Sequence, residues 1–211
     1  MLAIVSALLA AAGIALVLYL EWIKRPRLTV GIADPTDREY SKPGGSILKC
    51  RYVLVYVENG ALPVPLRRLT QRRTAAACGA LLTFRTPGQA RPLFDPVVGR
   101  WDGTPEPLQP RPDGGYVLDV TKVPAGQVKD VALAGREIVA VAVKFDGEPQ
   151  FYVWNNESYL HEWRRPPLLD GRQYDVDVSV QSGGVQVTAR FRLCNNGSSR
   201  HDLYLEHPPE R

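Results

Sequence analysis

An unbroken apolar run at the start of the chain constrains its fold more than any other feature. The run extends from Leu2 to Leu20, and Ser6 and Gly13 are its only weakly polar members. An α-helix rises about 1.5 Å per residue, so this run would measure roughly 28 Å, close to the thickness of the hydrocarbon core of a bilayer. The sequence therefore predicts a single membrane-spanning helix over residues 1–23.

The residues at the end of the run support a membrane span. Tyr19 and Trp22 stand where aromatic rings prefer the headgroup level, and three basic residues follow, Lys24, Arg25 and Arg27. Because Lys and Arg close to a span stay on the cytoplasmic side, we expect the N-terminus outside and the C-terminal domain in the cytoplasm. Acidic residues soon follow, so an extracytoplasmic domain is the alternative.

A cleaved signal peptide and a buried core helix are the competing explanations of the run. A signal peptide needs a basic N-terminal region, a short apolar region and a cleavage site of small residues. No basic residue precedes this run, and its apolar part is longer than that of a signal peptide. We therefore favour an uncleaved anchor.

Alanine recurs at every fourth position of the predicted span. Residues four apart lie on one helix face, where small side chains let two helices approach closely. The pattern allows the span to pair with itself or with a partner helix, although an Ala-rich span also produces such a stripe by chance. The candidate packing residues are Ala3, Ala7, Ala11 and Ala15.

The rest of the chain has the composition of a folded, β-rich domain. Eighteen Gly and eighteen Pro favour many short turns over long helices. The net charge of +4 is modest, and basic and acidic side chains are interspersed. We divide the chain into the anchor (1–23), a juxtamembrane segment with a first short strand (24–47), and a β-sandwich domain (48–207) with a Pro-rich excursion (87–112) and an aromatic, polar loop (154–165).

Two runs would each present two apolar faces if they formed strands, as strands in the middle of a sheet do. The first covers residues 49–58 and the second covers residues 137–145. In contrast, the segment 34–46 is polar and contains Gly and Pro, which predicts a loop. Regular alternation in the second run would place on one face Val139, Val141 and Val143, and on the other Ile138, Ala140 and Ala142.

The clearest local structure is a hairpin near the end of the chain. Apolar and polar residues alternate across 174–181 and 185–193, and Gly183-Gly184 supplies a two-residue turn. A one-residue slip would lose the apolar pairs and the ion pairs at once, so the register is strongly specified. The turn predicts that Val176 pairs with Phe191, Asp177 with Arg190 and Asp175 with Arg192.

Short strands separated by turn residues predict an antiparallel β-sandwich. The strand ending Val57-Glu58-Asn59-Gly60, followed by a small-residue strand opening Ala75-Ala76-Ala77, resembles the immunoglobulin-like, adhesion-type domains of prokaryotes. The closing run 169–193, with Gly171 before Tyr174-Asp175-Val176, resembles them too. The resemblance covers residues 48–206 and implies an immunoglobulin-like fold without a function. Such domains usually face outward, against the orientation that the charges predict.

The three cysteines, Cys50, Cys78 and Cys194, fall in strand-like runs, where we expect buried thiols that act as small hydrophobes. That suits a reducing compartment, although a Cys50–Cys78 or Cys78–Cys194 bridge stays open if the domain is outside. The cysteine spacing is not that of a zinc site. His201 and His207 would lie about 20 Å apart on a regular strand. We expect no metal and no cofactor.

The sequence contains no nucleophile elbow, phosphate loop or dinucleotide fingerprint. We therefore expect a membrane-anchored, non-enzymatic protein-interaction or scaffold module, an accessory part of a membrane assembly. An outward-facing adhesion or ligand-binding domain is one alternative, and an enzyme of unrecognised type is another.

Basic residues near the span are candidates for contact with anionic lipid headgroups, where each would contribute about 1 kcal/mol. A solvated loop is the simpler explanation of those in the Pro- and Arg-rich segment 61–74. Nucleic acid is not an expected partner, because basic residues do not interleave with aromatic ones. The lipid-headgroup candidates are Lys24, Arg25, Arg27, Arg67, Arg68, Arg72 and Arg73.

The aromatic, polar loop is the candidate surface for a protein partner. It combines aromatic anchors with adaptable polar groups, as binding surfaces do. The alternative is that the aromatic residues cap the core and the Asn residues cap turns. The candidates are Trp154, Asn155, Asn156, Tyr159, His161, Trp163 and Arg164.

Overall fold

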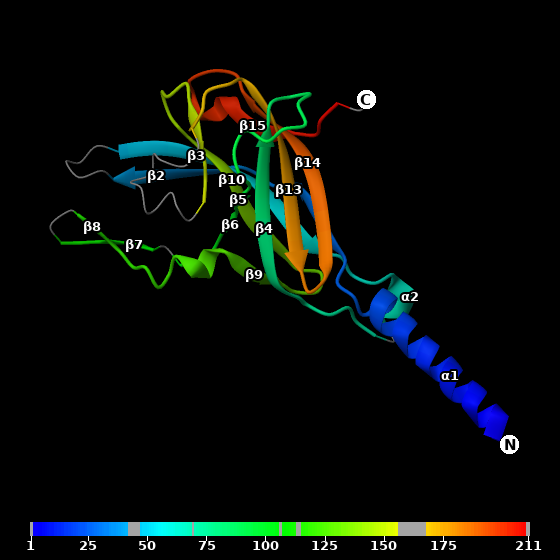
Figure 1. Ribbon diagram of the computed structural model, residues 1–211. Coiled ribbons are helices and arrows are strands. Elements are labelled where there is room, and N and C mark those ends of the chain that lie inside the picture. Colours follow the sequence, from blue (N-terminus) through cyan, green and yellow to red (C-terminus); the bar gives the residue numbers. More distant parts are fainter. Residues whose placement is uncertain are drawn as a thin grey trace.

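Two antiparallel sheets and one projecting apolar helix make up the chain in a computed structural model (Figure 1). The structure describes residues 2–41, 47–68, 70–105, 107–112, 115–155 and 168–209. The predictions of a mainly β chain and of an N-terminal apolar helix are both confirmed.

The N-terminal helix stands apart from the sheets. Helix α1 (Leu2–Leu18) continues into one π-helical turn, η1 (Tyr19–Ile23). The stretch Ile4–Ile23 is long and apolar enough to span a membrane, and none of it is buried inside the protein. Ala7, Ala11 and Ala15 are exposed. The side chain of Ala3 lies outside the described part, and helix–helix packing stays a prediction.

The first sheet holds the two strands that the sequence predicts to be central, β3 (Ile47–Asn59) and β10 (Arg136–Phe145). Its order is β1 (Leu28–Ile32), β3, β10, β11 (Phe151–Val153) and β12 (Leu168–Leu169), with β2 (Thr36–Ser41) also paired to β3 and β6 (Arg100–Trp101) to β10.

The second sheet is built around the predicted hairpin. Its order is β15 (Leu203–Glu206), β14 (Val185–Asn195), β13 (Gln173–Ser182), β4 (Ala75–Arg85) and β5 (Val97–Val98), with β9 (Val128–Val131) also on β4. A separate hairpin pairs β7 (Leu108–Pro110) with β8 (Tyr116–Leu118). The short helical turns are α2 (Val64–Arg67), η2 (Pro124–Gly126) and η3 (Arg200–Asp202).

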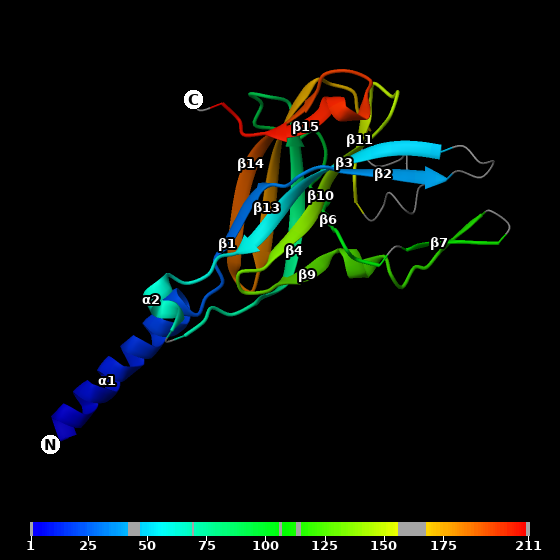
Figure 2. The same cartoon turned by 180° about the vertical axis from the view of Figure 1, so that it is seen from behind.

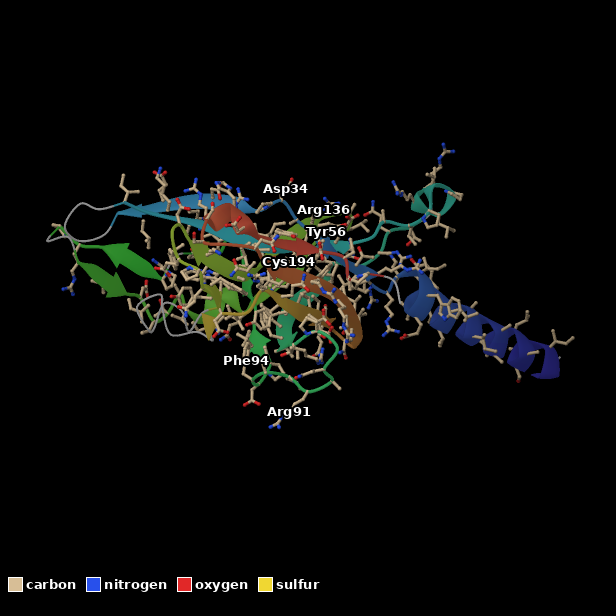
Figure 3. The ribbon with its side chains drawn as sticks, turned by 90° about the horizontal axis from the view of Figure 1, so that it is seen from above. Asp34, Tyr56, Arg91, Phe94, Arg136 and Cys194 are labelled. Atoms are coloured by element: carbon tan, nitrogen blue, oxygen red, sulfur yellow. The ribbon has the colours of Figure 1, made fainter. Side chains whose placement is uncertain are left out.

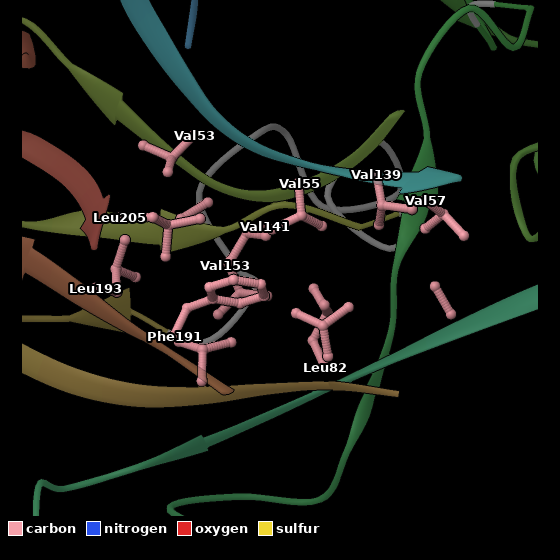
Figure 4. Close-up of a cluster of buried hydrophobic side chains, with 14 of the residues drawn as sticks. Val53, Val55, Val57, Leu82, Val139, Val141, Val153, Phe191, Leu193 and Leu205 are labelled. Carbon is pink, nitrogen blue, oxygen red and sulfur yellow. The ribbon is translucent and has the colours of Figure 1, made fainter. Parts of the chain in front are cut away.

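The main core lies between the two sheets. Val53, Val55 and Val57 project from one face of β3 toward β14, which supplies Phe191 and Leu193 (Figure 4). All five side chains are at most 3% exposed. Alternation along β3 therefore buries this face from Val53 to Asn59, as expected of a strand in the middle of a sheet.

A second apolar cluster covers the opposite face of the first sheet. It is formed around Tyr52 and Leu54 of β3, with Ala140, Val143 and Trp154. The predicted two-sided burial of β3 is thus confirmed.

The predicted facing of β10 is confirmed as far as Val141 and is wrong for Ala142 and Val143. A register shift between Ala140 and Ala142 marks an irregularity at Val141. A bulge adds one residue to a strand, so every later side chain changes face. Ala142 consequently joins the main core, and Val143 joins the second cluster.

The prediction of a loop over residues 34–46 is also wrong in part, because β2 occupies much of it. Strand β2 pairs with β3 from Thr36↔Tyr52 to Ser41↔Ile47. Its polar alternation carries cross-strand ion pairs instead of a buried face: Asp37–Arg51 at 2.8 Å and Glu39–Lys49 at 3.3 Å. Apolar periodicity cannot reveal such a strand.

The hairpin register is confirmed at every predicted pair. Val176 pairs with Phe191, Asp177 with Arg190 and Asp175 with Arg192. Gly183 and Gly184 have φ of 49° and 82°, as the turn requires. The three cysteines are buried and free.

Candidate interaction surfaces

Opposite ends of the folded molecule carry different surfaces. α2 lies beside the end of α1, whereas β2 and the β7–β8 hairpin project on the far side of the sheets (Figures 1 and 2). A view from above gives the same arrangement (Figure 3). The end beside α1 holds all seven lipid-headgroup candidates, which we call the basic collar: Lys24, Arg25, Arg27, Arg67, Arg68, Arg72 and Arg73.

The basic collar is assembled by hydrogen bonds between the chain leaving α1 and the segment 61–73. The Tyr19 hydroxyl lies 2.7 Å from Oγ1 of Thr70. The backbone N–H of Arg73 donates to the carbonyl of Lys24 at 2.9 Å, and Nη1 of Arg72 donates to the carbonyl of Arg25 at 3.1 Å. Segments about 50 positions apart in the sequence therefore run together.

Asn59 holds this junction from the end of β3. Its side chain is 0% exposed. Its Oδ1 accepts from the N–H of Arg27 at 3.1 Å, and its Nδ2 donates to the carbonyls of Arg73 at 2.9 Å and Val131 at 3.3 Å. The Asn-Gly pair marks only a turn in the sequence, so sequence reasoning missed this contribution.

The cations of the basic collar have little negative charge around them. Within the described residues, only Arg25 has an ion-pair partner, Glu21 at 3.9 Å. Burial and the nearby charge of Arg27 lower the pKa of Arg72. Nε of Arg72 is buried, and no described residue forms a hydrogen bond with it. The collar is therefore a positive surface that an anion would stabilise.

Two large apolar side chains are exposed beside the basic collar. Trp22 of η1 is 77% exposed and Val64 of α2 is 67% exposed. Pro63 and Pro65 flank Val64 and are exposed too. Exposed apolar side chains next to cations are typical of a surface that meets a lipid interface.

The far end carries a hollow of about 400 Å³ between β2 and the segment 102–105. Its lining includes Tyr52 and Trp154, whose rings meet edge to face with centroids 5.2 Å apart. Arg38 lies over the Tyr52 ring, 5.1 Å from its centroid, and pairs with Asp102 at 2.8 Å. The hollow thus combines an aromatic wall with a charged rim.

Of the two described residues of the predicted partner loop, Trp154 and Asn155, one lines this hollow. Trp154 lines the hollow and is 3% exposed, and Asn155 beside it is 3% exposed. The other candidates, Asn156, Tyr159, His161, Trp163 and Arg164, lie outside the described residues. Sequence reasoning missed Arg38 and Asp102, because each lies in a polar segment without periodicity and they meet only through the fold.

Lys144 is a buried cation that joins the two sheets. Its Nζ donates to Oδ1 of Asn195 and to the carbonyl of Gly197, and its side chain is 0% exposed. Burial lowers its pKa, although Asp202 acts in the opposite direction. These contacts make Lys144 a structural tie between β10 and the end of β14.

The chain matches no protein-family model, and neither the curated proteins nor the solved structures compared with it gave a match.

Proposed function

We propose that this protein is a membrane-anchored, non-enzymatic interaction module that presents a partner-binding hollow away from the bilayer. The observation that carries the proposal is the separation of the two surfaces. An apolar helix with unneutralised cations occupies one end, and an aromatic hollow with a charged rim occupies the other.

The lipid part of the proposal follows from the basic collar. Residues 4–23 cross the membrane, and the collar lies at the headgroup level, where anionic lipids attract each Lys or Arg. The segment 61–73 adds four basic residues to the three that directly follow the helix. All seven favour a cytoplasmic location of the domain. Protease added to intact cells should spare a C-terminal epitope tag, and digestion of the tag would contradict this orientation.

The partner part follows from the size and lining of the hollow. A volume of about 400 Å³ accommodates one or two side chains of a partner protein. Tyr52 and Trp154 suit an apolar or aromatic side chain, and the Arg38–Asp102 pair suits a neighbouring polar group. We further propose that the two sheets form an immunoglobulin-like sandwich, the class that the strand pattern resembles.

Site-specific photocross-linking tests the hollow. A photoreactive residue replaces Thr36 or Thr104, which line the hollow, or Thr188 on the exposed face of β14 as the control. We expect the same protein adduct from positions 36 and 104 in intact membranes and none from position 188. Adding Arg38→Ala should remove that adduct. Identical adducts at all three positions, or none, would contradict the proposal.

A further inference from the structure

The segment 61–73 is the strongest unexplained feature of the end that carries α1. It leaves the sandwich after β3, makes the short turn α2, and returns to β4. Its apolar residues Val64 and Pro65 do not join the core. Among the residues of this segment that the structure describes, only Leu62, at 3% exposure, is buried. A loop that served only to connect two strands would not need to expose Val64 beside the helix.

The contact between Tyr19 and Thr70 fixes the position of this segment along the axis of the candidate span. The candidate span ends at Ile23, and Tyr19 precedes that residue by four positions, or roughly 6 Å along a helix. Thr70 bonds to the Tyr19 side chain. The segment therefore reaches back along the last turn of the span, to the depth at which headgroups and acyl chains meet.

The side chains of α2 and its flank match that depth. Val64, at 67% exposure, supplies apolar surface, and Arg67 and Arg68, three and four positions later, are exposed cations. No carboxylate within the described residues forms an ion pair with either arginine. Segments that combine apolar residues with cations bind in the plane of an anionic membrane surface.

We propose that α2 is a second membrane contact of this protein, with Val64 and Pro65 in the bilayer interface and Arg67 and Arg68 on anionic headgroups. This inference rests on the proposed membrane anchoring of α1. It adds a point of attachment that would prevent the domain from rotating about a single helix, because two separate contacts define an orientation.

Fluorescent probes attached to single cysteines test the proposal. The native cysteines are at most 1% exposed, so an introduced cysteine is selectively labelled. The full chain is reconstituted in vesicles that contain phosphatidylglycerol, with an environment-sensitive fluorophore on Val64→Cys, Ile14→Cys or Val98→Cys. Ile14 reports on α1, and Val98, which is 41% exposed on β5, is the control in the sheets. Nitroxide lipids with shallow or deep labels quench the probes.

We expect the probe at position 64 to emit at a shorter wavelength than the probe at 98, and to be quenched at least twofold more by shallow than by deep nitroxides. The probe at 14 should be quenched most by deep nitroxides. Adding Arg67→Gln and Arg68→Gln should reduce quenching at 64 and leave quenching at 14 unchanged.

The outcomes separate the two proposals. Deep quenching at 14 with no quenching at 64 would overturn the contact of α2 and leave the anchor intact. Quenching at 64 without quenching at 14 would overturn the span, and with it α2 as a second contact beside that span. If neither position were quenched, both proposals would be wrong.

Discussion

Two regions of this protein are rich in arginine, and their arginines have opposite surroundings. On the outer face of the second sheet, Arg85 and Arg190 both contact Asp177, and Arg192 pairs with Asp175 at 3.1 Å. In the basic collar, Glu21 is the only carboxylate within ion-pair distance in the described part of the chain. Paired arginines hold strands in register, whereas unpaired ones create a field that acts on something outside the chain.

The two regions also differ in how the backbone is held. In the second sheet, ladder hydrogen bonds hold the strands and the ion pairs are additional. In the collar, irregular segments meet, and side chains such as Asn59 supply the hydrogen bonds that a sheet would provide. The backbone of the collar is therefore held by single side chains, and that of the second sheet by many ladder hydrogen bonds. Substitutions can test this difference.

Removing the Asn59 amide should have the largest effect. Asn59→Leu leaves the N–H of Arg27 and the carbonyls of Arg73 and Val131 without their partner. Each unsatisfied buried group costs roughly 1–3 kcal/mol, so we expect the free energy of unfolding to fall by at least about 2 kcal/mol. Urea denaturation in detergent measures it. The control is the exposed Asn196→Leu, and an equal loss there would contradict the role of Asn59.

Removing the shared carboxylate of the second sheet should have an intermediate effect. Asp177→Ala leaves Arg85 and Arg190 without their acid, and we expect a loss of about 1–2 kcal/mol in the free energy of unfolding. In a double-mutant cycle, Asp177→Ala should lower the free energy of unfolding less in the Arg190→Ala background than in the wild type. Strict additivity would show that the pair contributes nothing.

Acid should weaken the second sheet through the same residue. Burial alone would raise the pKa of Asp177, but hydrogen bonds from Arg190 and Arg85 outweigh it and lower the pKa below 3.8. The ion pairs therefore stabilise the fold fully above pH 3.8, and this contribution is lost as the pH falls through the folded-state pKa. Denaturation midpoints of the wild type and Asp177→Asn should converge as the pH falls below that value.

Substitutions in the basic collar should have the smallest effect on stability. Arg67→Gln with Arg68→Gln should change the free energy of unfolding by less than about 0.5 kcal/mol. Affinity for phosphatidylglycerol, measured by native mass spectrometry of the detergent-solubilised protein, should fall by about 1 kcal/mol per charge. Exposed arginines elsewhere, such as Arg91, are the control. A large loss of stability with unchanged lipid binding would reverse the comparison.

The sequence predicts structure well where one face is buried and a turn fixes the register. The hairpin of β13 and β14 follows from the alternation of its valines and from Gly183-Gly184. Strand β3 follows from its two apolar faces. The sequence also identifies three members of the basic collar, Lys24, Arg25 and Arg27, because they directly follow the apolar run.

The remaining features depend on contacts that no local pattern encodes. Strand β2 is stabilised by pairing with β3 and by ion pairs, so its sequence resembles a loop. The bulge at Val141 leaves a regular alternation in the sequence and changes it only in the fold. The hollow brings Arg38, Asp102 and Trp154 together from three distant segments, and the close approach of residues 61–73 to α1 depends on Asn59.

Strand β3 connects both surfaces in one unbroken element. Asn59 at one end holds the collar, and Tyr52, seven residues earlier, lines the hollow. A strand rises about 3.3 Å per residue, so the two positions are at most about 23 Å apart. If the collar lies on the headgroups, the length of β3 limits the distance between the hollow and the membrane surface. The hollow can then bind only partners close to that surface, such as the short juxtamembrane domain of a neighbouring protein.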